Sequence, residues 1–341
     1  MDKLIFTNII KTLKKPLNKW LLLLNSILFL LKFYYNYSIK VIMAIRRANT
    51  MKNITKLINK YMSVNEIFEY SKKLNQKYYA YMLDTQVWKL LFEISPQFLV
   101  DEFKKIQDFT IGHNVVNHIL MTFYPCEKQL KYFLTKTFIK RNKDTTIFEM
   151  RVNSSRIDVG RINGDSHAYE IKTELDTITK LEKQVNDYLR VFEFVEVVAH
   201  PKHIKSIIKI IPTNCGVISY EINKKKCNLN VEREALRSEM LDVNAQIKAL
   251  TSKDLEFIIK SYLSISIPLK RCDREEIILS LFDSESINEL FKIAIKKRYE
   301  DRSKYLCKYF NKINPIDIQE LYIGPIHPQK IYVKNSSIVT K

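Results

Sequence analysis

Asp158, Glu170 and Lys172 are the residues of this chain whose types and spacing suit chemistry on a phosphodiester. Glu170 and Lys172 are two apart on an apolar run, so on a β-strand their side chains share one face. Mg²⁺ prefers hard oxygen ligands and is typically held by one or two carboxylates. Asp158 and Glu170 could supply these carboxylates, and the lysine beside them could reach the water or the phosphate. The three residues therefore indicate a divalent-ion site for hydrolysis.

An Asn-Gly turn separates the two acids, and its length decides whether they meet. A two-residue turn would place Asp158 on the opposite face of the sheet from Glu170, because a shift of one position moves a side chain to the other face. A three- or five-residue loop, such as 163–165, would set the acids opposite each other. A bulge involving Gly160 would do the same. The sequence leaves these alternatives open.

The helix expected after the second acid adds two polar side chains. Gln184 and Tyr188 are four residues apart, so they share one face of that helix and could lean over the metal site. There they could bond a phosphate or the edge of a base. The alternative is an amphipathic helix whose Gln184 and Tyr188 only cover the sheet.

The pattern resembles a known superfamily. Asp158 followed by Glu170-Ile171-Lys172 is similar to the D…(D/E)XK signature of the PD-(D/E)XK nucleases, which include restriction endonucleases and RecB-type nucleases. Gln184-x-x-x-Tyr188 is similar to the Q-x-x-x-Y motif of the RecB-like branch and would complete the pocket. The resemblance covers residues 123–222 and is greatest to a group of uncharacterised bacterial members. Ile157 stands where the superfamily often has proline before the aspartate.

The resemblance also implies a role for each residue of the site. Asp158, Glu170 and the carbonyl group of Ile171 would ligate Mg²⁺ or Mn²⁺. Lys172 would position or activate the attacking water. Glu127 matches the extra acid that many members carry on their first helix, and it would join the metal ligands.

The elements that must position these residues alternate between helix and strand. The expected order is helix 127–140, strand 146–152, a hairpin containing Asp158 and Glu170, helix 179–192, strand 194–200, helix 202–209 and strand 216–222. This order predicts an α/β fold, a restriction-endonuclease-like core with a mixed central sheet flanked by helices.

Helical extensions are expected on both sides of this core. The predicted divisions are an apolar N-terminal segment at 1–50, a helical lead-in at 51–122 interrupted at Pro96, the nuclease-like core at 123–225 and a helical C-terminal region at 226–341. Capping-box patterns at Thr251 to Asp254 and at Ser286 to Glu289 predict the starts of two helices in the last region.

The N-terminal segment allows two interpretations. Residues 20–31 read "WLLLLNSILFLL", and such a length is more typical of a buried helix than of a membrane span. The wider zone 20–44 could contact or span a membrane if its lysines reach the interface. No small-residue cleavage site follows, which argues against a secretory signal. We expect a cytoplasmic protein, with membrane association through this segment as the alternative.

The net charge indicates which partners to expect, and the cysteine content indicates the compartment. The formal net charge is +19, from 56 Lys and Arg against 37 Asp and Glu. Such an excess favours a polyanion, with nucleic acid first and anionic lipid second, although a solvated lysine-rich surface would look the same. The five cysteines have no C-x-x-C spacing and the six histidines form no metal pattern, which indicates a reducing compartment without a zinc site.

These observations lead to three interpretations of function. The first is a metal-dependent nuclease that hydrolyses phosphodiester bonds, with DNA as the expected substrate. The alternative is a catalytically silent module of the same fold that binds nucleic acid or is tethered to a membrane. In a third, Glu170 and Lys172 form only a surface ion pair, which would contribute little in water. The oligomeric state stays open.

Overall fold

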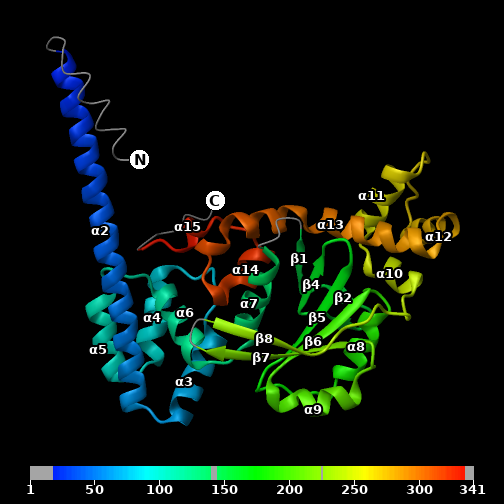
Figure 1. The fold of residues 1–341 in the computed structure, drawn as a ribbon, viewed down its shortest axis with the longest axis horizontal. Coiled ribbons are helices and arrows are strands. Elements are labelled where there is room, and N and C mark those ends of the chain that lie inside the picture. Colours follow the sequence, from blue (N-terminus) through cyan, green and yellow to red (C-terminus); the bar gives the residue numbers. More distant parts are fainter. Residues whose placement is uncertain (1–17, 140–143, 224–225, 335–341) are drawn as a thin grey trace. The chain divides into compact units, whose positions relative to one another are not determined.

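The structure is a computed structural model that describes residues 18–139, 144–223 and 226–334. The N-terminal part of the predicted apolar segment, before residue 18, lies outside these ranges. The chain divides into two compact units. One unit contains α2 (Asn18–Tyr61) and α5 (Gln97–Ile106), which pack against each other. The other contains the remaining elements and the sheet (Figure 1).

Helix α2 is a single helix of 44 residues. Between Ile27 and Ile45 it exposes large apolar and aromatic side chains, such as Phe29 at 70% exposure. Among the described residues, no helix combines the length and the apolar content needed to cross a bilayer. The apolar run of the sequence is therefore part of a longer helix that also carries polar and basic residues.

The range 51–122, predicted as one helical lead-in, is helical but is divided between the two units, because its residues 51–61 and α5 belong to the first. In the second unit it contributes α3 (Val64–Lys77), α4 (Asp84–Ile94) and α6 (Gly112–Phe123), and α7 (Glu127–Ile139) follows. Helix α3 starts at a capping box in which Ser63 and Glu66 satisfy each other's backbone N–H groups. Helix α4 ends before Pro96 and α5 starts after it, because proline disfavours helical conformation in the residue before it. The predicted interruption at Pro96 is confirmed.

The centre of the second unit is a mixed six-stranded sheet flanked by helices, so the predicted α/β class with a mixed sheet is confirmed. The strand order is β1-β4-β5-β6-β7-β8. The strands are β1 (Thr145–Phe148), β4 (Val159–Ile162), β5 (Ser166–Lys172), β6 (Phe194–Ala199), β7 (Gly216–Asn223) and β8 (Lys226–Arg233). Strands β5, β6 and β7 are parallel and the other pairs are antiparallel. The parallel pairs are joined by crossover helices α8 (Leu181–Leu189) and α9 (Pro201–Ile210).

Helices cover both faces of β5. Tyr169 packs on Phe138 of α7, with ring centroids 5.4 Å apart. The next residue, Glu170, is bonded by Tyr188 of α8. Successive strand residues point to opposite faces, so α7 and α8 lie on opposite sides of the sheet.

Two expectations about the strands were wrong. The run 146–152 is not one strand, because Glu149 adopts a positive φ of 57° and breaks it. Beyond the break, β2 (Arg151–Val152) pairs with β3 (Ser155–Arg156) in a separate small hairpin. Residues 226–233 were expected to belong to the helical C-terminal region, but they form β8, an edge strand of the sheet.

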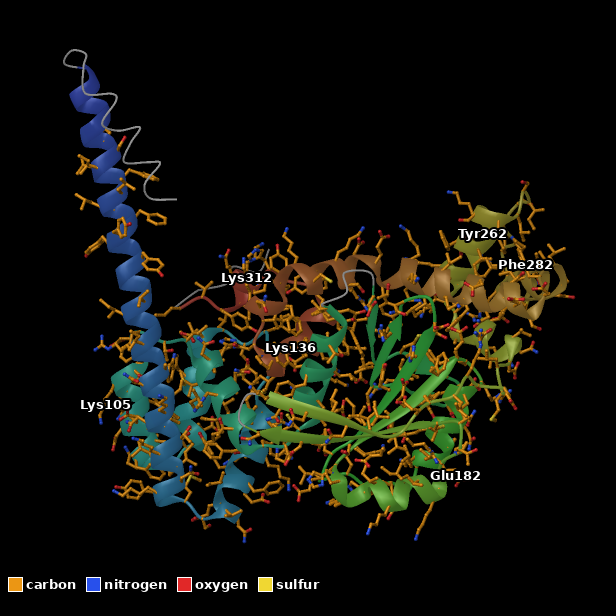
Figure 2. The ribbon with its side chains drawn as sticks, viewed as in Figure 1. Lys105, Lys136, Glu182, Tyr262, Phe282 and Lys312 are labelled. Atoms are coloured by element: carbon orange, nitrogen blue, oxygen red, sulfur yellow. The ribbon has the colours of Figure 1, made fainter. Side chains whose placement is uncertain are left out.

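The C-terminal region beyond β8 is helical. It contains α10 (Val243–Ala249), α11 (Ser252–Tyr262), α12 (Arg271–Leu281), α13 (Ser284–Tyr309), α14 (Ile318–Ile323) and α15 (Pro328–Ile331), with short 3-10 turns at Phe310–Lys312 and Pro315–Asp317. Tyr262 and Phe282 mark the ends of α11 and α12 in Figure 2. The capping box at Thr251 is confirmed. The one at Ser286 was wrong: α13 starts earlier, where the Asp283 side chain accepts a hydrogen bond from the Ser286 N–H.

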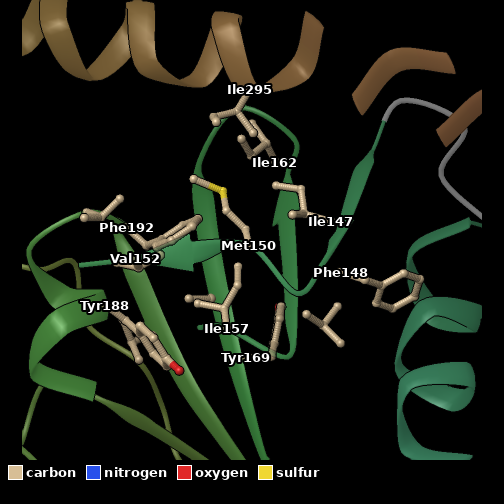
Figure 3. Close-up of a cluster of buried hydrophobic side chains, with 14 of the residues drawn as sticks. Ile147, Phe148, Met150, Val152, Ile157, Ile162, Tyr169, Tyr188, Phe192 and Ile295 are labelled. Carbon is tan, nitrogen blue, oxygen red and sulfur yellow. The ribbon is translucent and has the colours of Figure 1, made fainter. Parts of the chain in front are cut away.

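The hydrophobic core extends from the sheet to α13. Figure 3 shows Ile147, Ile162 and Ile295 gathered where α13 crosses β1 and β4, and Tyr188 and Phe192 at the α8 side. Burial of this apolar surface supplies the main driving force for folding. Helix α13 is therefore an integral part of the fold of this unit.

A buried carboxylate ties the start of β6 to this helix. Glu193 is fully buried and accepts hydrogen bonds from the backbone N–H of Ser166 (2.7 Å) and from Asn288 Nδ2 (2.9 Å) of α13. Lys292 and Arg237 also pair with it, at 3.3 Å and 2.6 Å. Burial alone would raise the pKa of Glu193, but these bonds and the two cations together lower it.

Candidate active site

The hairpin between β4 and β5 has the register that the metal hypothesis requires. Ile162 pairs with Ser166 and Val159 pairs with Tyr169, so the loop has three residues, 163–165. Gly164 takes a φ of 108°, which L side chains rarely adopt. Continued by one position, the same register sets Asp158 opposite Glu170. Of the alternatives that the sequence left open, the three-residue loop is the one observed.

Asp158 lies just before β4, and its side chain reaches across to β5. Its Oδ2 accepts a hydrogen bond of 2.7 Å from the backbone N–H of Ile171. Burial raises the pKa of Asp158 well above its ordinary value, and the charges of Glu170 and Glu127 raise it further. The aspartate is therefore held in place within a field of other carboxylates.

Glu170, Lys172, Gln184 and Tyr188 form one bonded group on the α8 face of β5. Lys172 Nζ donates to Glu170 Oε1 at 2.8 Å and to Gln184 Oε1 at 3.1 Å. The Tyr188 hydroxyl lies 2.8 Å from Glu170 Oε2 and 2.7 Å from the carbonyl oxygen of Arg156. Burial raises the pKa of Glu170 against the opposing effect of Lys172. All four of these sequence-predicted residues are brought together.

A second group of acids gathers around Asp158. One carboxylate oxygen each from Glu127, Glu149 and Asp158 lies within 4.8 Å of the other two. Glu127 is the first residue of α7, and Glu149 is the residue that breaks β1. The Glu149 N–H bonds the Asp158 carbonyl at 3.4 Å, which places the two residues side by side. Glu170 is not a member of this three-residue group, so Asp158 stands between the two sets of residues.

Two cations pair with the acidic group. Exposed Arg156 bonds Glu149 through its Nε at 2.6 Å, and the other cation is Lys131. It is fully buried, and its Nζ pairs with both Glu127 and Glu149 and donates to Gln319 Oε1 at 2.6 Å. Burial alone would lower the pKa of Lys131, but the surrounding carboxylates outweigh it and raise the pKa. The ammonium group therefore keeps its charge and offsets part of the negative charge.

Three residues of this site were not found from the sequence. The spacing of Lys131 four residues after Glu127 on a helix is a signal that could have indicated an ion pair. Glu149 had no such signal, because the sequence predicts one continuous strand over 146–152, without the break that brings Glu149 to the site. Gln319 lies 188 residues from Lys131 along the chain, and no local pattern links them.

The crowding of carboxylates around Asp158 should lower the stability of the folded chain at neutral and higher pH. Replacing Asp158 with Asn keeps an acceptor for the Ile171 N–H. It removes the carboxyl group, whose pKa is raised in the folded chain. A raised folded pKa means that wild-type stability falls as pH rises above the ordinary aspartate range. We expect Asp158→Asn to raise the free energy of unfolding by about 1–2 kcal/mol at pH 8 in EDTA. Urea unfolding at pH 5 and pH 8 measures it.

The matched control is Asp165→Asn, an exposed acid in the β4–β5 loop. This change should leave the free energy of unfolding nearly unchanged at both pH values. If Asp158→Asn proves less stable than the wild type at pH 8, the charge of Asp158 is not the strained group that its surroundings imply.

Comparison with known proteins gives one family. Residues 127–322 match the family model described as Bacteriophage P4 protein cII. Protein cII of Enterobacteria phage P4 is 26% identical over 201 residues, which cover 57% of this chain and 76% of that protein. The search of solved structures gave no match. The matched range starts at Glu127 and includes Gln319, so it spans the whole candidate site.

Proposed function

This chain belongs to the family of bacteriophage P4 protein cII, and from the geometry of its site we propose that it is a metal-dependent nuclease hydrolysing phosphodiester bonds, with DNA as the substrate. The core would be restriction-endonuclease-like. The observation that carries the proposal is the position of Asp158, between the Glu127–Glu149 pair and the Glu170–Lys172 pair.

The donor set fits a hard divalent cation. Asp158, Glu127 and Glu149 offer carboxylate oxygens within 4.8 Å of one another, and Mg²⁺ or Mn²⁺ prefers such ligands. Glu170 and the Ile171 carbonyl group remain candidate ligands beside them. Besides Lys131, a metal ion would add positive charge near Asp158, whose pKa is raised by burial and further by the charges of Glu170 and Glu127. Such an ion, when bound, acts as a Lewis acid and lowers the pKa of a coordinated water.

The protein's own residues would orient the reactants. Lys172 offers an ammonium group held by Glu170 and Gln184, and a positioned cation of this kind stabilises negative charge that develops on a phosphate. Tyr188 fixes Glu170 through its second oxygen, so the carboxylate keeps one orientation. Gln184 and Tyr188 thus serve as positioning residues in this proposal.

Incubation of the purified protein with plasmid DNA tests the activity directly. We expect nicking or cleavage with Mg²⁺ or Mn²⁺ and none in EDTA. Duplex, single-stranded and branched DNA and RNA should be compared under the same conditions. If all four stay intact with either metal, the nuclease proposal fails.

Lys131 favours a second candidate, a nucleic-acid-binding module without hydrolysis. Its ammonium group already pairs with Glu127 and Glu149, and it could take the place of a metal there. The two candidates differ in what Mg²⁺ does to stability, because an ion that binds the folded state alone stabilises it by about 2.7 kcal/mol at 100 times its Kd.

The variant Lys131→Met separates the two candidates. Removing the buried cation should cost about 3 kcal/mol in EDTA, because Glu127 then loses its cation and Glu149 keeps only the exposed Arg156. If the acids hold a metal, Mg²⁺ should raise the melting temperature of wild type and should raise that of Lys131→Met by more. Melting temperatures indifferent to Mg²⁺ and Mn²⁺ in both proteins would favour the silent module.

A further inference from the structure

A basic groove runs beside α13, and its lining residues are not those of the candidate active site. It has a volume of about 810 Å³. We call it the α13 groove and define it by six of its lining residues: Lys296, Lys297, Lys304 and Lys308 of α13, Phe257 of α11 and Thr145 of β1. No part of the reaction proposed above uses these residues.

The acids of the groove are already paired. Glu300 accepts from Lys297 Nζ at 2.9 Å and from Lys304 Nζ at 2.5 Å. The other lining acid, Asp144, is bonded by Arg161 Nε at 2.7 Å. In the described part of the chain, Lys296 and Lys308 have no acidic partner within ion-pair distance. The groove therefore keeps a positive charge that its own residues do not neutralise.

We propose that the α13 groove binds the phosphodiester backbone of a nucleic acid strand, an inference that rests on the proposed nuclease function. From Lys296 to Lys308 the helix rises about 18 Å, at 1.5 Å per residue. At about 3.4 Å per phosphate along one strand, that length matches about five phosphates. A row of this length suits a polymer, whereas a single phosphate would engage only one or two lysines.

The apolar wall of the groove fits the same ligand. Phe257 and Ile293 line it together with the lysines. Nucleic-acid strands are commonly bound by cations that follow the backbone and by aromatic rings against which bases stack. A membrane presents a flat layer of headgroups, which would not fill a groove with an aromatic side chain in its wall.

The groove and the candidate active site lie along the same strand. Thr145 lines the groove at the start of β1, and Glu149 lies four residues later in the acidic group. At about 3.3 Å per residue, β1 rises about 10 Å from Thr145 to its last residue, Phe148, and Glu149 follows directly. A nucleic-acid strand bound in the groove could therefore extend to the carboxylates of the candidate active site.

Charge reversal of Lys296 and Lys308 tests the inference. Binding of a fluorescent oligonucleotide is measured by anisotropy in EDTA, so that cleavage plays no part. We expect Lys296→Glu with Lys308→Glu to weaken binding at least about tenfold at 0.1 M salt. It should also reduce the slope of log K against log salt by about 1.8 on duplex, or 1.4 on single strands, for two lost phosphate contacts. The control pair, Lys205→Glu with Lys209→Glu, lies on exposed positions of α9 outside the groove.

A second variant should have the opposite effect. Glu300→Gln removes the carboxylate that Lys297 and Lys304 share, so both lysines become available to phosphates. We expect tighter binding and a steeper salt dependence. Glu285→Gln, at an exposed position on the same helix but outside the groove, makes the same change in net charge. It should shift the affinity far less.

The outcomes separate this inference from the proposed activity. It is overturned if the α9 pair weakens binding as much as the α13 pair, or if Glu300→Gln matches Glu285→Gln. It is also overturned if Lys296 and Lys308 govern binding to vesicles of anionic phospholipid but not to the oligonucleotide. A protein that binds through the groove yet cleaves nothing would leave the inference standing and remove the nuclease.

Discussion

Replacing Asp158 with Asn, or Lys172 with Met, is expected to reduce metal-dependent cleavage about 1000-fold. A bound metal and a cation positioned at the phosphate each supply several kcal/mol of transition-state stabilisation. A loss of about 4 kcal/mol corresponds to three powers of ten in rate. The double variant should fall little further than either single one, since residues that act as a unit are not additive. Single-turnover cleavage of plasmid measures all three.

Two controls make this result specific. Glu182→Gln removes an exposed acid of α8, labelled in Figure 2, and should cleave like the wild type. Asp158→Asn is expected to be more stable than the wild type, so its loss of activity could not be attributed to unfolding. If the Asp158 and Lys172 double variant still cuts at the wild-type rate, another site performs the reaction.

Asp317, in the helical part of the second unit, should contribute strongly to the pH dependence of stability. Its carboxyl is fully buried and accepts hydrogen bonds from Tyr332 (2.7 Å) and Tyr78 (3.0 Å). Burial raises the pKa of Asp317 to about 7, despite the opposing effect of these bonds. The folded chain thus holds a proton that the unfolded chain has already released between about pH 4 and pH 7.

The sign of the effect follows from this difference. The contribution of the protonated Asp317 to the free energy of unfolding is fully present below the ordinary aspartate pKa. It is lost as pH rises towards about 7. In Asp317→Asn the side chain cannot ionise, so this loss disappears. Between pH 4 and pH 8 the free energy of unfolding should change in favour of the variant by about 4 kcal/mol, at 1.36 kcal/mol per pKa unit. Urea unfolding across this range measures the difference.

Asp301→Asn is the matched control, because Asp301 is an exposed acid of α13. Its stability curve should run parallel to that of the wild type. A parallel curve for Asp317→Asn as well would mean that the Asp317 carboxyl titrates in its ordinary range, and the account of its burial would be wrong.

The sequence predicted the residues that meet on β5 because their positions depend on short-range geometry. Glu170 and Lys172 share a face by the alternation of a strand, and Gln184 and Tyr188 share a face by the period of a helix. The meeting of Asp158 with Glu170 was conditional, since an Asn-Gly pair allows loops of different length. The observed loop 163–165 resolved that condition.

The errors occurred where local patterns compete with tertiary structure. Strand β8 lies at an edge and keeps most of its side chains exposed. Cys227, Leu229 and Val231 alternate with polar residues as in a half-buried strand, but the predicted helical region was extended over them. At the start of α13 the capping residue is Asp283, three residues before the predicted Ser286. The strand breaks at Glu149 because this residue adopts a positive φ, and no neighbouring glycine indicates such a conformation in the sequence.

The bonding of Glu193 has a consequence for synthesis on the ribosome. Its carboxylate needs Asn288 and Lys292, about 95 residues further along the chain. While those residues are still unmade, the nascent sheet has a carboxylate that it can bury only at a cost of several kcal/mol. Completion of the core therefore has to wait for α13 to emerge, and a chain truncated after β8 should be a poor folding unit even though all its strands are present.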